Sequence, residues 1–573
     1  MSAGAPDRWD HECDVLVVGS GAGGLAAALT AWHEGLDVLL VEKTARIGGS
    51  TAISGGAIWV PLNDQSAAAG HPDSWDAVWE YLHHTVGAAA SEAQRRAFLQ
   101  AGPQALTYLR EHAGLHLVAR TYSPDYHPDR PGAALGGRSL DPVEFDGRAL
   151  GKHFAELRDP LPEFMVLGGM MVTMTDVRHL LAATRSFASW RHGMRLLLRY
   201  GMDRLRGYHR GARLVLGNAL AGRLFCSLLE VGVAYWLHAP ARALVQDGKG
   251  RVVGALVERD GQRRGVHARR GVVLAAGGFP WHETLRAKHY PQPTGPYSMS
   301  PQSDSGDGIE LALSIGAAMG EGGVGPAQWA PVSMLTRTDG SVVRYPHLVW
   351  DRAKPGLIAV DAAGKRFVNE STSYHEFVRG MYAAHARSPA IPALLVADSS
   401  FVECWGLGLA LPGGRPRAHL ERAGYLLKAD TLTALASMAG IDPDGLQSTV
   451  TAYNEAARHG EDPEFGRGGT AYNRYLGDPD HRPNPCVAPL DKPPYYAVKV
   501  WPGDIGTALG LRIDGQARVL SASDEPIPGL YAAGNDAHSV MGGEYPAPGI
   551  TLGPALAFGW VAGMHLAHGN STG

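Results

Sequence analysis

The strongest constraint on the fold is a glycine-rich turn between two apolar runs near the start of the chain. The run DVLVV precedes Gly19, Gly21 and Gly24, which form a G-x-G-x-x-G arrangement; a predicted helix over 23–34 follows, and a second apolar run ends at Glu42. Such a βαβ unit is typical of dinucleotide-binding folds, in which the turn approaches a pyrophosphate and the acid contacts ribose hydroxyls. The sequence therefore predicts a Rossmann-like α/β domain that binds a nucleotide cofactor.

Four further glycine-rich segments indicate that the cofactor is long. They are RIGGSTAISGGAIWVP (46–61), RRGVVLAAGGF (269–279), SGDGIELALSIGAA (305–318) and IPGLYAAGNDAHSVMGG near the end of the chain. A nicotinamide enzyme has no need of the first of these, whereas the pyrophosphate and ribityl chain of FAD extend beyond the Rossmann turn and need close backbone. We therefore predict FAD, with these cofactor-binding residues: Gly19, Ser20, Gly21, Ala22, Gly23, Gly24, Glu42, Lys43, Thr44, Gly49, Ser50, Thr51, Ser54, Gly55, Gly56, Ala276, Gly277, Gly278, Asp307, Gly534, Asn535, Ile550 and Leu552.

Length and composition bound the remaining possibilities. A chain of 573 residues predicts two or more domains, and a net charge of −4 argues against nucleic acid as a partner. The four cysteines are far apart in sequence, with no metal-ligand spacing, which predicts reduced thiols in the cytoplasm and no metal site. The polar N-terminus and the lack of a long apolar run predict neither a signal peptide nor a spanning helix.

Changes in residue pattern along the chain divide it into three parts. We expect residues 1–333 and 496–573 to form the FAD-binding domain, with residues 334–495 inserted between them as an α+β catalytic domain that caps the substrate. A second insertion is expected at about 165–235. It includes nine arginines and one acid between positions 185 and 223, and Arg191, Arg195 and Arg199 share a helix face. This segment is either a solvated helical insertion or a basic amphipathic surface in peripheral contact with anionic lipid.

The combined motifs resemble a known group of flavoproteins. DVLVVGSGAGG, GGSTAISGG and the C-terminal GLYAAGN…MGGEYPAPGITLGPALAFG resemble the flavoproteins related to fumarate reductase and succinate dehydrogenase. Within that group, the Tyr-x-x-Pro-Gly pattern is similar to that of the 3-ketosteroid Δ1-dehydrogenases. The resemblance implies an FAD-dependent oxidoreductase that introduces a C1–C2 double bond into a hydrophobic 3-ketosteroid, and an external quinone-like or dye acceptor that reoxidises the flavin.

The resemblance also implies roles for individual residues. Tyr545 and the amide of Gly549 match the pair that polarises the 3-oxo group, as two fixed donors aimed at a developing oxyanion. Tyr374 matches the base that removes a proton from C2, before hydride passes from C1 to flavin N5. For the phenol that assists the base we choose Tyr126, although Tyr122 remains an alternative. A neighbouring phenol or positive charge is expected to lower the pKa of the base.

Three other functions remain open at this point. Relatives of similar appearance desaturate C4–C5 of 5α-steroids, and others act as flavin-dependent desaturases of different ketones. A more distant alternative is a flavin- or lipid-binding protein without catalysis. Gly543 and Glu544 stand where the compact steroid dehydrogenases are expected to have His-Thr, and this departure bears on the substrate more than on the reaction.

Overall fold

The computed structural model describes residues 8–321 and 323–569. Its larger sheet is built on the predicted βαβ unit: β1 (His11–Val18) pairs in parallel with β2 (Val38–Val41) and with β13 (Gln262–Leu274). Residues 15–18 and 38–41 are buried, as expected for strands covered on both faces. The sheet is completed by β10 (Ala234–Trp236), β11 (Ala241–Gln246), β12 (Val252–Arg259), β20 (Arg518–Leu520) and β21 (Pro526–Ala532).

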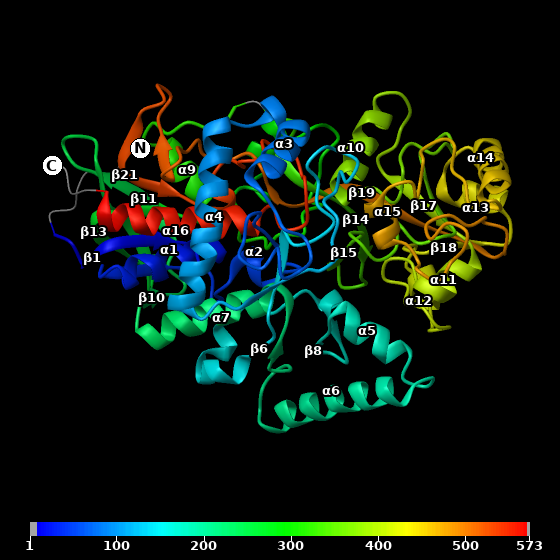
Figure 1. The fold of residues 1–573 in the computed structure, drawn as a ribbon, viewed down its shortest axis with the longest axis horizontal. Coiled ribbons are helices and arrows are strands. Elements are labelled where there is room, and N and C mark those ends of the chain that lie inside the picture. The colour runs from blue at the N-terminus through cyan, green and yellow to red at the C-terminus, as the bar shows by residue number, and fades with distance from the viewer. Residues whose placement is uncertain (1–7, 322, 570–573) are drawn as a thin grey trace.

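Two glycine-rich helices pack on this sheet at close range. The predicted first helix is α1 (Ala22–His33), and it lies beside the C-terminal α16 (Leu552–His568) in Figure 1. A Cβ atom on Gly559 would lie 2.4 Å from the carbonyl oxygen of Gly23, so only glycine permits this approach. The helices near the two ends of the chain, α1 and α16, therefore lie in one layer. Other helices of this part are α2 (Gly49–Ala52), α3 (Trp75–Thr85), α4 (Glu92–Ala113), α7 (Leu216–Val231), α8 (Glu283–His289) and α9 (Asp307–Leu313).

A second sheet lies beside the first one and carries its own helices (Figure 1). Its strand order is β15-β14-β19-β17-β16, with β18 paired to β19. Helix α10 (Tyr374–His385) packs against β14, and α13 and α14 cover a separate apolar cluster. The bounds are β14 (Ala327–Thr336), β15 (Val342–Pro346), β16 (Leu357–Val360), β17 (Ala393–Ala397), β18 (Leu427–Ala429), β19 (Tyr495–Thr507), α11 (Ser399–Trp405), α12 (Ala418–Arg422), α13 (Leu432–Ala439), α14 (Pro443–Ala457) and α15 (Ala471–Leu476).

A small helical lobe projects below both sheets in Figure 1. It contains α5 (Met174–Leu181) and α6 (Phe187–Leu205), joined to the body through β6 (Phe145–Asp146) and β9 (Arg213–Leu214). Short pairings complete the fold: β3 (Ile58–Trp59) and β4 (Leu117–Ala119) with β5 (Ser139–Pro142), and β7 (Met165–Val166) with β8 (Met170–Met171).

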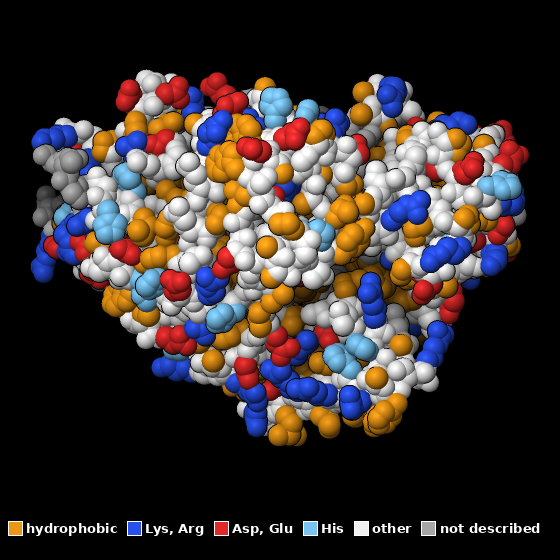
Figure 2. Space-filling model, in the orientation of Figure 1, with side chains coloured by type: hydrophobic (Ala, Val, Ile, Leu, Met, Phe, Trp, Pro, Cys, Tyr) orange, Lys and Arg blue, Asp and Glu red, His pale blue; other side chains and the backbone are white. Residues whose placement is uncertain are grey.

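Helix α6 has one buried face and one exposed apolar face. Ser189, Gly193 and Leu196 face the lobe and are buried. On the opposite side, Phe187 is 75% exposed and Leu205 is 86% exposed, and Trp190, Leu198 and Met202 share that face. Orange side chains accordingly mark the lower edge of the molecule beside arginines in Figure 2. No helix in the described part of the chain is long and apolar enough to cross a membrane.

Candidate active site

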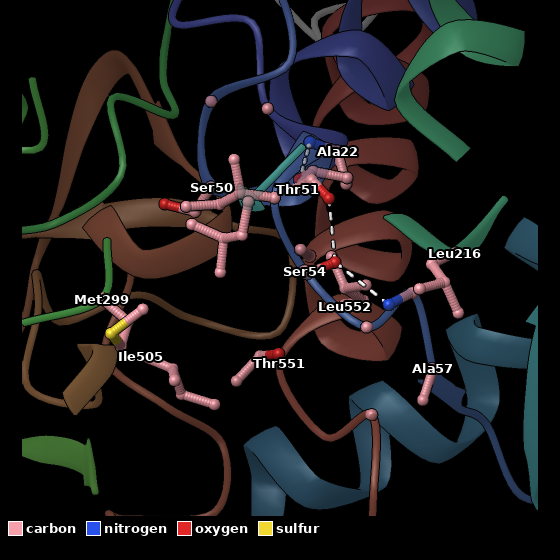
Figure 3. A pocket seen from close by; sticks show the side chains of 18 of the residues that line it. Ala22, Ser50, Thr51, Ser54, Ala57, Leu216, Met299, Ile505, Thr551 and Leu552 are labelled. Carbon is pink, nitrogen blue, oxygen red and sulfur yellow. Dashed lines mark hydrogen bonds between the residues drawn. The ribbon is translucent and has the colours of Figure 1, made fainter. Parts of the chain in front are cut away.

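One large cavity connects the glycine turn after β1, the second sheet and the helical lobe. Its volume is about 910 Å³, and its wall includes residues from both predicted domains. Figure 3 shows the part nearest α1, where Ser50, Thr51 and Ala22 lie together and Met299 and Ile505 line the opposite wall. The Ala22 N–H donates to Thr51 Oγ1 at 2.9 Å, which ties the second glycine-rich segment to the start of α1.

Three tyrosines that are distant in sequence meet in this cavity. The hydroxyl oxygens of Tyr126 and Tyr374 lie 3.0 Å apart, and those of Tyr374 and Tyr545 lie 2.9 Å apart. All three side chains line the cavity and are at most 7% exposed. Tyr374 is the first residue of α10, where the Ser373 hydroxyl accepts from the Glu376 N–H and caps the helix. The base expected from the sequence is therefore presented from a capped helix end.

The two candidates for the assisting phenol lie in different surroundings. Tyr126 contacts Tyr374 directly, and its N–H donates to the carbonyl of Pro546 at 2.8 Å, which joins it to the turn that carries Tyr545. Tyr122 also lines the cavity, but it is 47% exposed and its ring packs edge-on against Tyr475. The geometry therefore favours Tyr126.

Burial controls the pKa values in this cluster. It raises the pKa of Tyr374 to about 12, while the hydrogen bonds to Tyr126 and Tyr545 and the Arg120 charge lower it. The pKa values of Tyr126 and Tyr545 are raised well above the ordinary value, chiefly by burial. The sequence-based expectation of a lowered pKa is thus met only in part. The neighbouring phenols and Arg120 act in the expected direction, burial outweighs them, and Tyr374 has the smallest rise of these three phenols.

Gly549 lies in the turn just before α16. Its φ of +104° favours glycine, and a Cβ atom there would lie 2.5 Å from the Trp59 nitrogen. Its carbonyl accepts from the Trp59 N–H at 3.0 Å, while its own N–H has no hydrogen-bond partner among the described residues. Tyr545 and Gly549 both line the cavity. A hydroxyl and an unused amide are therefore available to a ligand oxygen.

Known flavoproteins match this chain along nearly its whole length. The family model described as an FAD binding domain matches residues 14–552. A 4-oxocyclohex-2-ene-1-carboxylate 5-dehydrogenase from Sinomonas cyclohexanicum is 40% identical, covering 97% of this chain and 94% of its own. A 3-oxosteroid 1-dehydrogenase from Mycobacterium tuberculosis (strain H37Rv) is 37% identical, covering 97% and 98%. This chain belongs to the FAD-binding domain family.

A solved structure gives the same result for the fold. The 3-ketosteroid Δ1-dehydrogenase from Sterolibacterium denitrificans, in complex with 1,4-androstadiene-3,17-dione, matches with a TM-score of 0.90 and 39% identity, covering 98% of this chain and 100% of that one. The FAD-binding α/β fold and the family resemblance predicted from the sequence are confirmed. The protein is an FAD-dependent oxidoreductase, and its reaction is a dehydrogenation.

The cavity of this flavoenzyme fits FAD at the α1 end. The first turn of α1 has no acid. The Ala22 N–H is bonded to Thr51, while the Gly23 N–H has no hydrogen-bond partner among the described residues, so this amide and the positive helix end are open to a pyrophosphate. Gly19 has a φ of +104°, and a Cβ atom there would lie 2.2 Å from the Ala275 oxygen. Glu42 lines the cavity and already accepts from the hydroxyl and N–H of Ser20 and from the Thr44 N–H. It is thereby fixed where a ribose is expected.

Most of the predicted cofactor residues line the cavity, and four do not. Gly24 packs against Gly19, directly after β1, and a Cβ atom there would lie 2.0 Å from the Gly19 oxygen. The Gly278 N–H donates to Asp536, which holds Gly278 outside the cavity wall. Thr44 donates its N–H to Glu42 from outside the wall. Ile550 is buried and does not line the cavity. The predicted residues that do line it are Gly19, Ser20, Gly21, Ala22, Gly23, Glu42, Lys43, Gly49, Ser50, Thr51, Ser54, Gly55, Gly56, Ala276, Gly277, Asp307, Gly534, Asn535 and Leu552.

Sequence reasoning missed a second set of wall residues. Asp304 lines the cavity, accepts from the Ser50 hydroxyl, and has its pKa raised to about 7 by burial. The segment SPQSDSG around it does contain the small polar residues that could have drawn attention. Tyr472 was also missed: its ring centroid lies 4.6 Å from that of Tyr126, and it lines the cavity too. Other missed positions near the glycine turns include Met299, Ser300, Leu216 and Thr551.

Proposed function

We propose that this enzyme introduces a C1–C2 double bond into a 3-ketosteroid. The observation that carries the proposal is the buried cluster of Tyr126, Tyr374 and Tyr545 beside the unused amide of Gly549. A flat ketone in this cavity would meet two hydrogen-bond donors at its oxygen and a phenol beside its α-carbon. The names of the relatives from M. tuberculosis and S. denitrificans support a steroid as the substrate.

The proposed chemistry assigns one task to each side chain. Tyr545 and the Gly549 amide bind the 3-oxo group and stabilise the negative charge that grows on its oxygen during enolisation. Tyr374, from the second sheet domain, removes the C2 proton that this polarisation makes more acidic. Tyr126 donates to the Tyr374 oxygen and stabilises its deprotonated form. Bound FAD supplies the hydride acceptor, and a quinone-like compound or dye serves as the external oxidant.

Anaerobic bleaching of the flavin tests this reaction. We expect 4-androstene-3,17-dione to reduce the bound flavin and to lose two hydrogens at C1–C2, as measured by mass spectrometry and NMR of the product. Bleaching by 5α-androstane-3,17-dione alone would instead indicate Δ4 chemistry. A flavin that dithionite reduces and that no ketone bleaches would overturn catalysis and leave a binding protein.

We further propose that the helical lobe rests on an anionic membrane. The outward face of α6 carries Phe187, Trp190, Leu198 and Leu205, all of them exposed. Exposed arginines, among them Arg191 and Arg195, lie along one edge of this face, where they could contact lipid phosphates. Residues of α5, which packs against α6, also line the cavity. A hydrophobic ketone could therefore pass from the bilayer to the cavity through this lobe.

A further inference from the structure

Charged side chains of the cavity wall between the tyrosines and the helical lobe fall into two groups. Arg120 donates to both oxygens of Asp141, at 2.8 and 2.6 Å, and Arg213 is paired with Glu144. These four wall residues neutralise one another. Arg178 and Lys354 also line the cavity, but neither forms an ion pair with any described acid. The wall therefore holds two positive side chains that have no ion-pair partner among the described acids.

Lys354 is fixed in place without a counter-charge. Its Nζ donates to the carbonyl oxygens of Leu476 and Gly477, both at 2.8 Å, and lies 4.9 Å from the Trp405 ring centroid. The residue is only 8% exposed. An ammonium group has three donors, so one N–H remains after the two carbonyls are satisfied. Burial lowers the pKa of Lys354 to about 8, although Asp478 acts in the opposite direction.

Arg178 adds a second charge beside the first. It lies on α5, is exposed, and makes no hydrogen bond through its side chain to a described residue. Both side chains line the same cavity, and the Arg178 charge acts in the same direction as burial on the pKa of Lys354. Like charges that approach across a cavity destabilise the unliganded protein unless an anion lies between them. The arrangement is therefore typical of an anion site.

We propose that Arg178 and Lys354 bind a carboxylate group of the substrate, so that the ring ketone this enzyme oxidises carries an acidic substituent remote from its reacting carbonyl. This inference rests on the proposed ketone dehydrogenation. The buried tyrosines hold the ketone end, and the exposed Arg178 marks the end of the cavity that opens at the helical lobe. Two kinds of substrate combine a ring ketone with such a carboxylate: a short oxocyclohexane carboxylate and a steroid with a carboxylate side chain.

Matched acid and ester substrates test the carboxylate site in the FAD-loaded enzyme. The pairs are 4-oxocyclohexanecarboxylate and 3-oxo-4-pregnene-20-carboxylate, each with its methyl ester, assayed with a dye acceptor. We expect one acid to exceed its ester in kcat/KM by about 10- to 100-fold, and Arg178→Gln to remove that advantage through KM. The acid that shows the larger preference identifies the length of the substrate. Added salt should weaken the preference.

Two controls separate this inference from the reaction itself. Arg185→Gln alters another exposed arginine of the lobe that does not line the cavity, and it should leave the acid preference unchanged. Lys354→Met should also reduce the preference, and its melting temperature shows whether the end of α15 is still intact. Equal kcat/KM for acid and ester, or an equal loss for both in Arg178→Gln, would overturn the carboxylate site while dehydrogenation stands.

A binding measurement covers the case in which no ketone turns over. Cyclohexanecarboxylate and 5β-cholanic acid lack the ketone, and their methyl esters lack the charge, so titration followed by calorimetry reports the anion site alone. Tighter binding of either acid than of its ester, lost in Arg178→Gln, would support the site even if the proposed reaction fails. Equal binding of acids and esters would overturn it.

Discussion

The two ends of the substrate cavity use opposite physical means. At the tyrosine end, Tyr126, Tyr374 and Tyr545 are uncharged, almost fully buried and linked through their hydroxyls. At the other end, Arg178 is exposed and Lys354 is charged without a paired acid. Burial strengthens hydrogen bonds to a developing oxyanion, whereas a charge near solvent contributes mainly to the specificity of ligand binding. We therefore propose that the first end sets the rate and that the second end selects the substrate.

Tyr374→Phe should have the largest effect on the tyrosine end of the cavity. The ring stays and only the hydroxyl is lost, so kcat should fall about 10²- to 10⁴-fold because the proton acceptor is gone. Stopped-flow reduction of the flavin measures the loss directly, and the unchanged flavin absorbance shows that the cofactor remains bound. Tyr122→Phe is the matched control at an exposed phenol of the same wall. If both variants keep the wild-type rate, the base lies elsewhere.

Tyr545→Phe should have the next largest effect. It removes one of two donors to the ketone oxygen, and the Gly549 amide remains, so we expect kcat to drop about 10²- to 10³-fold. Tyr472→Phe is the control, since its ring packs on Tyr126 and its hydroxyl has no hydrogen-bond partner among the described side chains. A loss confined to KM would show that Tyr545 binds the substrate and does not stabilise the transition state.

The two ends should also respond to pH in opposite directions. Burial raises the pKa of Tyr374 to about 12, so the deprotonated fraction rises about tenfold per pH unit between pH 7 and 9, and kcat/KM for a neutral ketone should rise with it. The pKa of Lys354 is lowered to about 8, so its charge disappears as pH rises through that value. The preference for an acid over its ester should then decline. Identical pH profiles for the acid and for its ester would contradict separate roles for Tyr374 and Lys354.

Local patterns in the sequence led to most of the residues that line the α1 end of the cavity, and their contacts with FAD stay predictions. Gly19 and Glu42 belong to one βαβ unit, where the chain direction alone brings turn and acid to the same edge of the sheet. Asp304 was missed because it reaches the wall through a loop with no periodic pattern. Gly24 and Gly278 were assigned to the cofactor because they belong to glycine-rich turns. A Cβ atom would meet the Gly19 carbonyl at Gly24 and the Thr507 hydroxyl at Gly278, so close packing alone already accounts for both glycines.

The residues of the tyrosine end were predicted through the family resemblance. Tyr126 and Tyr374 are separated by 248 residues and Tyr374 and Tyr545 by 171, so no local pattern could bring them together. The short distances between their hydroxyls agree with the shared site that the resemblance implies, and their catalytic roles stay predictions. Lys354 was missed for the same reason, because its surroundings are formed by α15 and by Trp405. A lone lysine in DRAKPGL has no signature of its own.

The arginine-rich segment shows how packing revises a sequence pattern. The spacing of Arg191, Arg195 and Arg199 predicted one shared basic face, and all three lie on α6. Arg199 is paired with Glu144, which removes it from any lipid surface. The stronger feature is the exposed apolar face through Phe187 and Leu205, opposite the buried Leu196. The hydrophobic residues of a helix do not reveal which of two faces packs against the rest of the protein.

Helix α6 gives the smallest expected effect and extends the comparison beyond the cavity. Phe187→Ser with Leu205→Ser removes two exposed apolar side chains, so binding to vesicles of phosphatidylglycerol and phosphatidylcholine should weaken about three- to tenfold in a sedimentation assay. The kcat for a ketone dissolved in buffer should be unchanged, because both side chains lie outside the cavity wall. Leu411→Ser with Met438→Ser, at two other exposed positions outside the cavity wall, offers a comparison of similar apolar loss. Equal weakening in both double variants would mean that the protein adsorbs through general hydrophobicity. Loss in the α6 variant alone would place the membrane contact at the lobe that carries Arg178.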